Sequence, residues 1–215
     1  MTKQIFNIGW PSGILHLLFQ LGSMVLFMII GALPENKIEI MAAFTNGLKI
    51  ESAIFLPAFA FNMANSVVVG NLLGQKKDEE AVRNGVVTAL MGVIIVSIMT
   101  VVIMINARLI AGVLSDNINV VNECTRYIYI ALLAEPIMAW GVILSGGLNG
   151  AGDTKSVMLI AGAGIWLVRI PLCYILGVHF ALGAAAVWWS MNASILVQSG
   201  LMTVRYFRKK WIVHT

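Results

Sequence analysis

The chain has 215 residues, of which 59% are hydrophobic and only 11% are charged. Soluble domains carry about 25% charged residues and about 45–50% apolar ones, so an ordinary water-soluble fold is excluded. The net charge of +4 comes from Lys and Arg residues between apolar stretches. This pattern indicates a signal for membrane topology, and it argues against nucleic-acid binding.

Six apolar stretches follow one another, each close to the roughly 20 residues that a bilayer-spanning helix needs. They predict helices over residues 12–33, 46–73, 85–106, 127–148, 156–178 and 180–204. The first apolar run is too long for a signal-peptide core, so we expect it to remain as a membrane anchor. The joints between the stretches are short; the longest is Ala107–Arg126. Residues 1–215 are therefore predicted to form one all-α integral membrane domain, a bundle of six transmembrane helices.

The distribution of basic residues predicts the topology, because cytoplasmic segments keep an excess of Lys and Arg. With six spans, both termini share one side of the membrane. That side would hold nine basic residues: Lys3, Lys76, Lys77, Arg83, Lys155, Arg205, Arg208, Lys209 and Lys210. The opposite joints hold three: Lys37, Arg108 and Arg126. We expect a multi-pass protein of the inner (plasma) membrane with both termini in the cytoplasm.

Four ionisable residues stand inside predicted spans, where an ionised group costs about 2.5 kcal/mol or more. Lys49 and Glu51 are expected to extend their side chains to the outer interface. Glu135 and Arg169 lie 14 residues on either side of the joint Asn149–Lys155, and so at the same depth. We expect these two to form an ion pair. Two interpretations remain open: a purely structural pair, or a proton or substrate site that uses Glu135.

Prolines and polar residues recur at related positions. Pro57, Pro136 and Pro171 fall at similar depth in three helices, and interrupted helices at mid-membrane are typical of transporter binding sites. Polar residues at helical spacing form three stripes: His16, Gln20 and Ser23; Asn62, Asn65 and Ser66; Ser190, Ser194 and Gln198. These stripes are expected to face away from lipid, toward helix contacts or a water-filled cavity.

No catalytic or metal-binding motif is present, so we expect neither an enzyme nor a metal site.

Two local features predict packing details. The spacings of Gly9 and Gly13 and of Gly146 and Gly150 are typical of close contact between two helices. Asp153 is expected to cap the helix that begins near Ser156, because Asp is a favoured N-cap residue.

Several segments carry a family resemblance. Val69–Gln75 resembles the segment after the second helix of each lobe in the MATE family of multidrug and toxic compound extrusion transporters. Leu148–Lys155 is similar to that family's loop between the fourth and fifth helices of a lobe. Arg169–Leu172 and Tyr206–Trp211 are similar to the late part of the C-terminal lobe. The resemblance covers essentially the whole chain and implies the C-terminal lobe of a twelve-helix transporter.

The resemblance also implies a function: secondary active efflux of multidrug substrates or organic cations, in exchange for sodium or protons and without a further cofactor. In the sodium-linked branch, acidic residues on the first and fourth helices of this lobe are important, and the matching positions here are Gln20 and Met138. Glu135 lies one helical turn before Met138 and is a candidate substitute. The candidate residues for the substrate and cation pathway are therefore Gln20, Asn62, Glu135 and Arg169.

Alternating access needs two bodies, and six helices supply one. Three readings remain open: a fragment or truncated product of a full transporter whose other part is a covalent N-terminal half, a homodimer of two such lobes, or a non-transporting lobe that modulates or assembles with another transporter. A lobe of a lipid-linked sugar flippase is a further alternative, although its cavity would be more basic than one containing only Arg169. The expected partners are a small organic substrate, the lipid bilayer and a second six-helix lobe.

Overall fold

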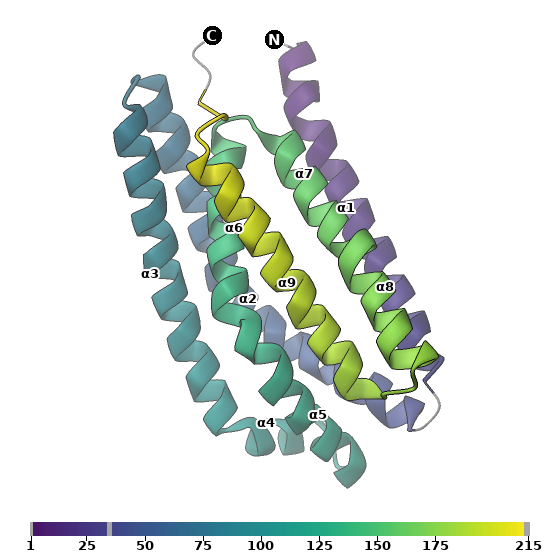
Figure 1. Ribbon diagram of the computed structural model, residues 1–215. Helices are drawn as coiled ribbons and strands as arrows, with labels where there is room; N and C mark the ends of the chain where they lie inside the picture. Colours follow the sequence, from purple (N-terminus) through teal and green to yellow (C-terminus); the bar gives the residue numbers. More distant parts are fainter. Residues whose placement is uncertain (1, 34–35, 213–215) are drawn as a thin grey trace.

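The computed structural model describes residues 2–33 and 36–212, which are almost entirely helical. The helices are α1 (Thr2–Gly31), α2 (Lys37–Gly74), α3 (Asp78–Ile105), α4 (Ala107–Leu114), α5 (Ile118–Ala131), η1 (Leu132–Ala134), α6 (Glu135–Gly150), α7 (Thr154–Ala163), η2 (Gly164–Arg169), α8 (Ile170–Leu172), η3 (Cys173–His179) and α9 (Ala184–Phe207). Helices α5, η1 and α6 follow one another directly, as do α7, η2, α8 and η3. The described chain therefore forms six long rods (Figure 1), as the sequence predicted.

Five of these rods are long and apolar enough to cross a membrane: Gly13–Gly31, Lys37–Gly74, Asp78–Ile105, Ile118–Gly150 and Thr154–His179. The sixth rod is α9, whose 24 residues are also enough to span a bilayer. This helix is less apolar because it carries several polar residues. Those that are buried among the other helices are Ser190, Asn192, Ser194 and Ser199. The fold is that of an all-α, six-helix transmembrane bundle.

The helix bounds correct several sequence predictions. Helices α1 and α2 begin at Thr2 and Lys37, ten and nine residues before the predicted starts at 12 and 46, because a helix can extend beyond the apolar stretch that lies in lipid. The predicted joint Ala107–Arg126 contains α4 and the first turns of α5. Helix α5 begins there because the Asn117 side chain accepts a hydrogen bond from the Asn119 backbone N–H at 2.9 Å.

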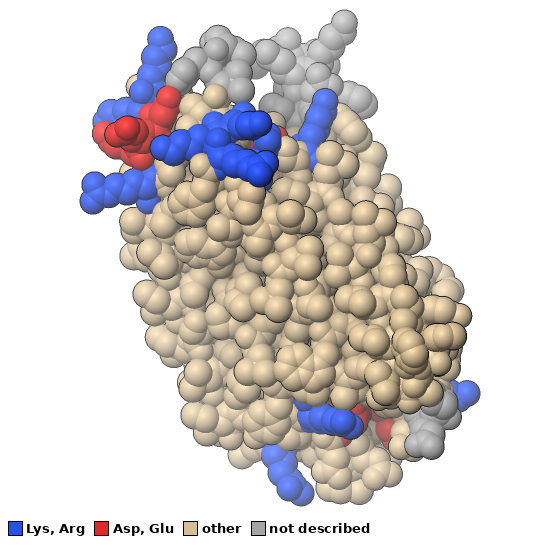
Figure 2. Space-filling view, viewed as in Figure 1, with Lys and Arg blue, Asp and Glu red and all other residues tan. Residues whose placement is uncertain are grey.

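Large apolar side chains cover the outside of the bundle. Leu56, Ile98 and Leu167 are 69%, 59% and 74% exposed. Figure 2 shows charged side chains at the two ends of the visible face, with a broad uncharged band between them. A surface of this kind is stable when lipid surrounds its middle, so the prediction of a multi-pass membrane protein is confirmed.

The two ends of the bundle differ in basic charge. Helix α1 begins and helix α9 ends at the same end (Figure 1). Exposed basic side chains lie at that end, beside the α2–α3 turn, the α6–α7 turn and the end of α9: Lys76, Lys77, Arg83, Lys155, Arg208, Lys209 and Lys210. Lys37, Arg108 and Arg126 belong to elements at the other end.

Helices α2 and α6 form the most extensive helix pair in the bundle. A Cβ atom at Gly146 would collide with the backbone of Asn62, and one at Gly150 would collide with the backbone of Ser66. Only glycine therefore permits this approach of the two backbones. The close helix contact predicted from glycine spacing is confirmed for this pair, whereas a Cβ atom at Gly13 would meet nothing within 4 Å.

Two of the three intramembrane prolines mark breaks in regular α-helix. Pro136 follows the 3₁₀ segment η1 at the start of α6. Pro171 lies in α8, between the π-helical segments η2 and η3. Pro57 lies inside α2, which continues through it as an α-helix. Because π-helical turns often occur at functional sites, the region around Pro171 and its neighbour Arg169 is of interest.

Candidate functional site

A cavity of about 620 Å³ lies inside the bundle. Helices α1, α2, α5, α6, α7 and α9 and the segment η2 all contribute to its wall. Apolar and aromatic side chains form much of the lining, and the polar residues are His16, Glu51, Ser52, Asn62, Glu135, Ser145, Asn149, Arg169, Asn192, Gln198 and Ser199. Mostly apolar cavities of about 300–1,000 Å³ with a few polar groups are typical of small-molecule sites.

Glu135 is the most deeply buried acidic residue of this wall, with only 3% of its surface exposed. It is the first residue of α6, where the chain changes from the 3₁₀ segment η1 to an α-helix. Its Oε2 atom is buried and has no hydrogen-bond partner among the described residues. A buried carboxylate oxygen without a partner is costly, so Glu135 remains a candidate site residue.

Arg169 lines the same cavity, but the predicted ion pair with Glu135 is wrong. Neither residue belongs to the ion pairs that the structure gives for the described side chains, which are Lys77–Glu80, Glu123–Arg126 and Asp153–Arg205. The Nε atom of Arg169 instead donates a hydrogen bond to Ser194 Oγ at 2.9 Å. The prediction assumed regular α-helices, whereas Arg169 ends a π-helical segment whose wider turn changes the direction of its side chain.

Glu51 also lies in the cavity wall, which the sequence analysis did not predict. Its Oε1 atom accepts a hydrogen bond of 2.5 Å from the hydroxyl group of the fully buried Tyr127. The expected extension to the membrane interface is therefore wrong for Glu51. Of these two residues, Lys49 is the one with an exposed side chain. A signal was present in the sequence, since Glu51 lies 11 residues before Asn62, three helical turns away on the same face of α2.

The two amide candidates differ in their positions. Asn62 lines the cavity, and its Nδ2 atom donates hydrogen bonds to Val142 O at 2.5 Å and to Ser145 Oγ at 3.2 Å. It therefore also joins α2 to α6. Gln20 has an exposed side chain outside the cavity lining, although His16 of the same helix lines it.

The geometry can be compared with known proteins. Residues 11–175 match the MatE family. The chain belongs to the MatE family. MatE membership confirms the resemblance found in the sequence, and it places the chain among transporters rather than enzymes.

MatE relatives are similar over nearly the whole chain. A probable multidrug resistance protein NorM of Thermotoga maritima is 26% identical over 215 residues, covering 97% of this chain and 44% of the relative. The multidrug resistance protein MdtK of Proteus mirabilis is 29% identical over 216 residues, covering 98% of this chain and 46% of the relative. The chain thus spans about half the length of the curated relatives it matches.

Solved MatE structures have the same fold. The MATE transporter ClbM in complex with Rb⁺ has a TM-score of 0.89 at 19% identity, over 98% of this chain and 49% of that one. The Vibrio cholerae MATE transporter VcmN in the bent form has a TM-score of 0.86 at 19% identity, over 97% of this chain and 47% of that one. The six-helix bundle therefore corresponds to one half of a MATE fold.

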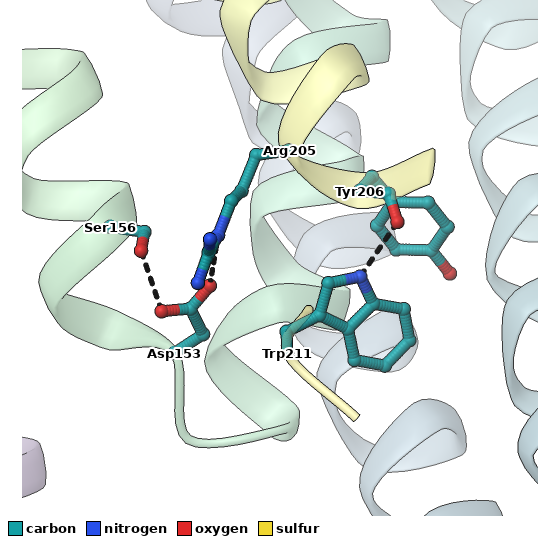
Figure 3. Close-up of polar contacts among 5 residues, drawn as sticks. All are labelled: Asp153, Ser156, Arg205, Tyr206 and Trp211. Carbon is teal, nitrogen blue, oxygen red and sulfur yellow. Dashed lines mark hydrogen bonds and ion pairs between the residues drawn. The ribbon is translucent and has the colours of Figure 1, made fainter. Parts of the chain in front are cut away.

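The segment Leu148–Lys155, which carried the MatE resemblance, is joined to the end of α9 at the basic end of the bundle (Figure 3). Asp153 Oδ2 accepts a hydrogen bond from Arg205 Nε at 2.7 Å, and its Oδ1 accepts one from Ser156 Oγ at 2.6 Å. Asp153 thus occupies the N-cap position of α7, but its carboxylate accepts hydrogen bonds from side chains and not from a backbone N–H, contrary to the predicted cap. The indole N–H of the buried Trp211 donates to Tyr206 O at 2.7 Å. These contacts fasten the α6–α7 turn and the chain after α9 to the bundle.

Proposed function

We propose that the chain is one lobe of a secondary active efflux transporter. The assembled transporter exports multidrug substrates or organic cations in exchange for sodium or protons. The single observation that carries this proposal is Glu135: a buried carboxylate with an unpartnered oxygen in the wall of a drug-sized cavity, inside a MatE bundle. The names of the curated relatives, which are multidrug resistance proteins, support the substrate class.

The cavity charges support a cationic ligand over a lipid-linked sugar. A flippase for anionic lipid-linked sugars would favour a basic cavity. Here two acidic side chains, Glu51 and Glu135, line the same cavity as one basic side chain, Arg169. Of the candidate residues, Glu135 and Arg169 are proposed to act in coupling, and Asn62 in contacting the substrate. Gln20 lies on α1 outside this cavity, and it is therefore proposed to take part in the pathway only through a second lobe that faces α1.

A second six-helix lobe completes the pathway. Alternating access moves two bodies about a site between them, and this bundle corresponds to one of them. The lobes of this family are expected to be parallel repeats, so a covalent N-terminal half or a second copy could each supply the other body without inversion. The length of the relatives supports the covalent arrangement.

The basic end of the bundle is proposed to face the cytoplasm. The greater number of Lys and Arg residues at the end shared by α1 and α9 supports this orientation. The protein then lies in the inner membrane with both termini in the cytoplasm.

Expression of the chain alone tests the assembly. Its mass in detergent and its cation-dependent dye efflux are measured on the same preparation. A dimer with efflux supports self-assembly, and a monomer that exports dye only when a second MatE lobe is co-expressed supports a lobe that needs a partner. A chain that supports no efflux in either setting and co-purifies with an intact transporter would show a modulator instead.

A further inference from the structure

The contact between Glu51 and Tyr127 is constructed by several elements of the fold. Tyr127 lies on α5 and Glu51 on α2, and the hydroxyl group of Tyr127 donates to Glu51 Oε1 at 2.5 Å. Hydrogen bonds to a charged group at this distance are among the stronger ones in proteins. The Oε2 atom of Glu51 has no hydrogen bond to any described residue, and the side chain lines the cavity. One carboxylate oxygen is thus held, and the other is available to a ligand.

Glycine at position 47 makes this contact possible. Gly47 lies one helical turn before Glu51, on the same face of α2. A Cβ atom at Gly47 would collide with the ring of Tyr127. The ring therefore lies directly across the backbone of α2, and this places its hydroxyl group at Glu51.

An aromatic cluster fixes the other side of the Tyr127 ring. Trp188 packs against Tyr127 edge to face at 4.7 Å between ring centroids, and Phe44 does so at 5.8 Å. Phe44 and Trp188 stack on each other at 5.5 Å. All three rings are almost completely buried. Such packing leaves the tyrosine ring little freedom to leave its position.

The cluster is anchored in turn at the end of the bundle away from the termini. The indole N–H of Trp188 donates to Glu123 Oε1 at 3.3 Å, and Glu123 Oε2 lies 3.9 Å from Arg126 Nη1. Helices α2, α5 and α9 are thereby joined around Tyr127. None of these anchoring side chains lines the cavity, so their effect on a ligand passes through Glu51.

We propose that Glu51 is a binding point for the positively charged group of a cavity ligand, and that Tyr127 is the positioning residue that holds its carboxylate toward the cavity. This inference rests on the proposed function, because it concerns the same cavity. It adds a contact on α2 that is separate from the coupling role given to Glu135. A ligand enters with its apolar part against the aromatic residues Phe55 and Phe59 and with its cationic centre at Glu51.

Binding of two ions with the same shape and opposite charge tests the proposal. Tetraphenylphosphonium is the cation and tetraphenylborate the anion. Calorimetric titration of each into the full 215-residue chain in non-ionic detergent gives the dissociation constants, and thermal denaturation of each variant monitors folding. The variants are Glu51→Gln, Tyr127→Phe and Gly47→Ala, with Tyr129→Phe as the matched control because Tyr129 lies on α5 and is 46% exposed.

We expect Glu51→Gln to weaken cation binding about tenfold or more, because a charged contact is lost. Tyr127→Phe and Gly47→Ala are expected to weaken it to a smaller extent, whereas Tyr129→Phe leaves it unchanged. None of the variants is expected to weaken binding of the anion, which a general loss of structure would do.

Each result has a distinct meaning. If wild-type chain binds the cation but Glu51→Gln binds it equally well, the proposed binding point is wrong while the proposed function stands. If Glu51→Gln weakens cation binding but Tyr127→Phe and Gly47→Ala do not, the positioning role of Tyr127 is overturned. If wild-type chain binds the anion more tightly than the cation, both the proposed binding point and the cationic substrate class are contradicted.

Discussion

Replacing Gly146 with alanine is expected to destabilise the bundle by about 3 kcal/mol or more, although only one methyl group is added. The new Cβ atom would collide with the backbone oxygen of Asn62, and the helices can relieve this only by separating. Separation would also break the hydrogen bonds from Asn62 to Val142 O and Ser145 Oγ. In detergent, the midpoint of thermal denaturation is expected to fall by about 6 °C or more.

Gly200→Ala is the matched control for this substitution. Gly200 lies within α9, and a Cβ atom there would meet nothing within 4 Å. Alanine favours a helix over glycine by up to about 1 kcal/mol, so this variant is expected to be as stable as wild type or slightly more stable. Equal midpoints for the two variants would show that α2 and α6 do not pack through Gly146.

Glu135→Gln is expected to abolish coupled efflux, with a loss of at least about tenfold in gradient-driven transport. Glutamine keeps the size of the side chain but can neither exchange a proton nor balance a cation. The assay uses proteoliposomes in which this chain is assembled with a second lobe, under an imposed sodium or proton gradient. Because Oε2 of Glu135 has no protein partner in the described structure, removing its charge breaks no ion pair and is expected to preserve the fold.

Glu39→Gln serves as the control, since Glu39 lies in the first turn of α2 and outside the cavity. It is expected to transport at the wild-type rate. Full coupled efflux by Glu135→Gln would assign Glu135 a structural role only. Loss of transport in both variants would point to a general effect of removing acidic residues.

The sequence predicted the long helices well and the directions of individual side chains poorly. Apolar length alone places the spans, because the bilayer requires about 20 residues of helix. Depth, counted along a helix, predicted Glu135 and Arg169 at the same level, and the structure has both residues in the wall of one cavity. Depth says nothing about rotation around the helix, and the π-helical turn before Arg169 changes that rotation.

Glu51 shows why the candidate site was only partly predicted. Its distance along α2 suggested the membrane interface, where acidic residues are common. The structure turns it inward because Tyr127, 76 residues later in the chain, reaches it across Gly47. A contact of this kind depends on two helices whose relative position the sequence does not contain. The polar stripe that includes Asn62 on the same face of α2 was the one available signal.

The central claim is that these helices cross a bilayer and place the α2–α3 turn, the α6–α7 turn and the end of α9 on one side of it. Single-cysteine labelling tests this claim most directly. In a cysteine-free background, Lys77→Cys, Lys155→Cys and Lys209→Cys are expected to react with a membrane-impermeant maleimide only after the cells are permeabilised. Lys37→Cys and Asp116→Cys, which belong to the other end and are exposed, are expected to react in intact cells. Labelling of Lys77→Cys and Lys155→Cys from opposite sides would contradict the six-helix arrangement.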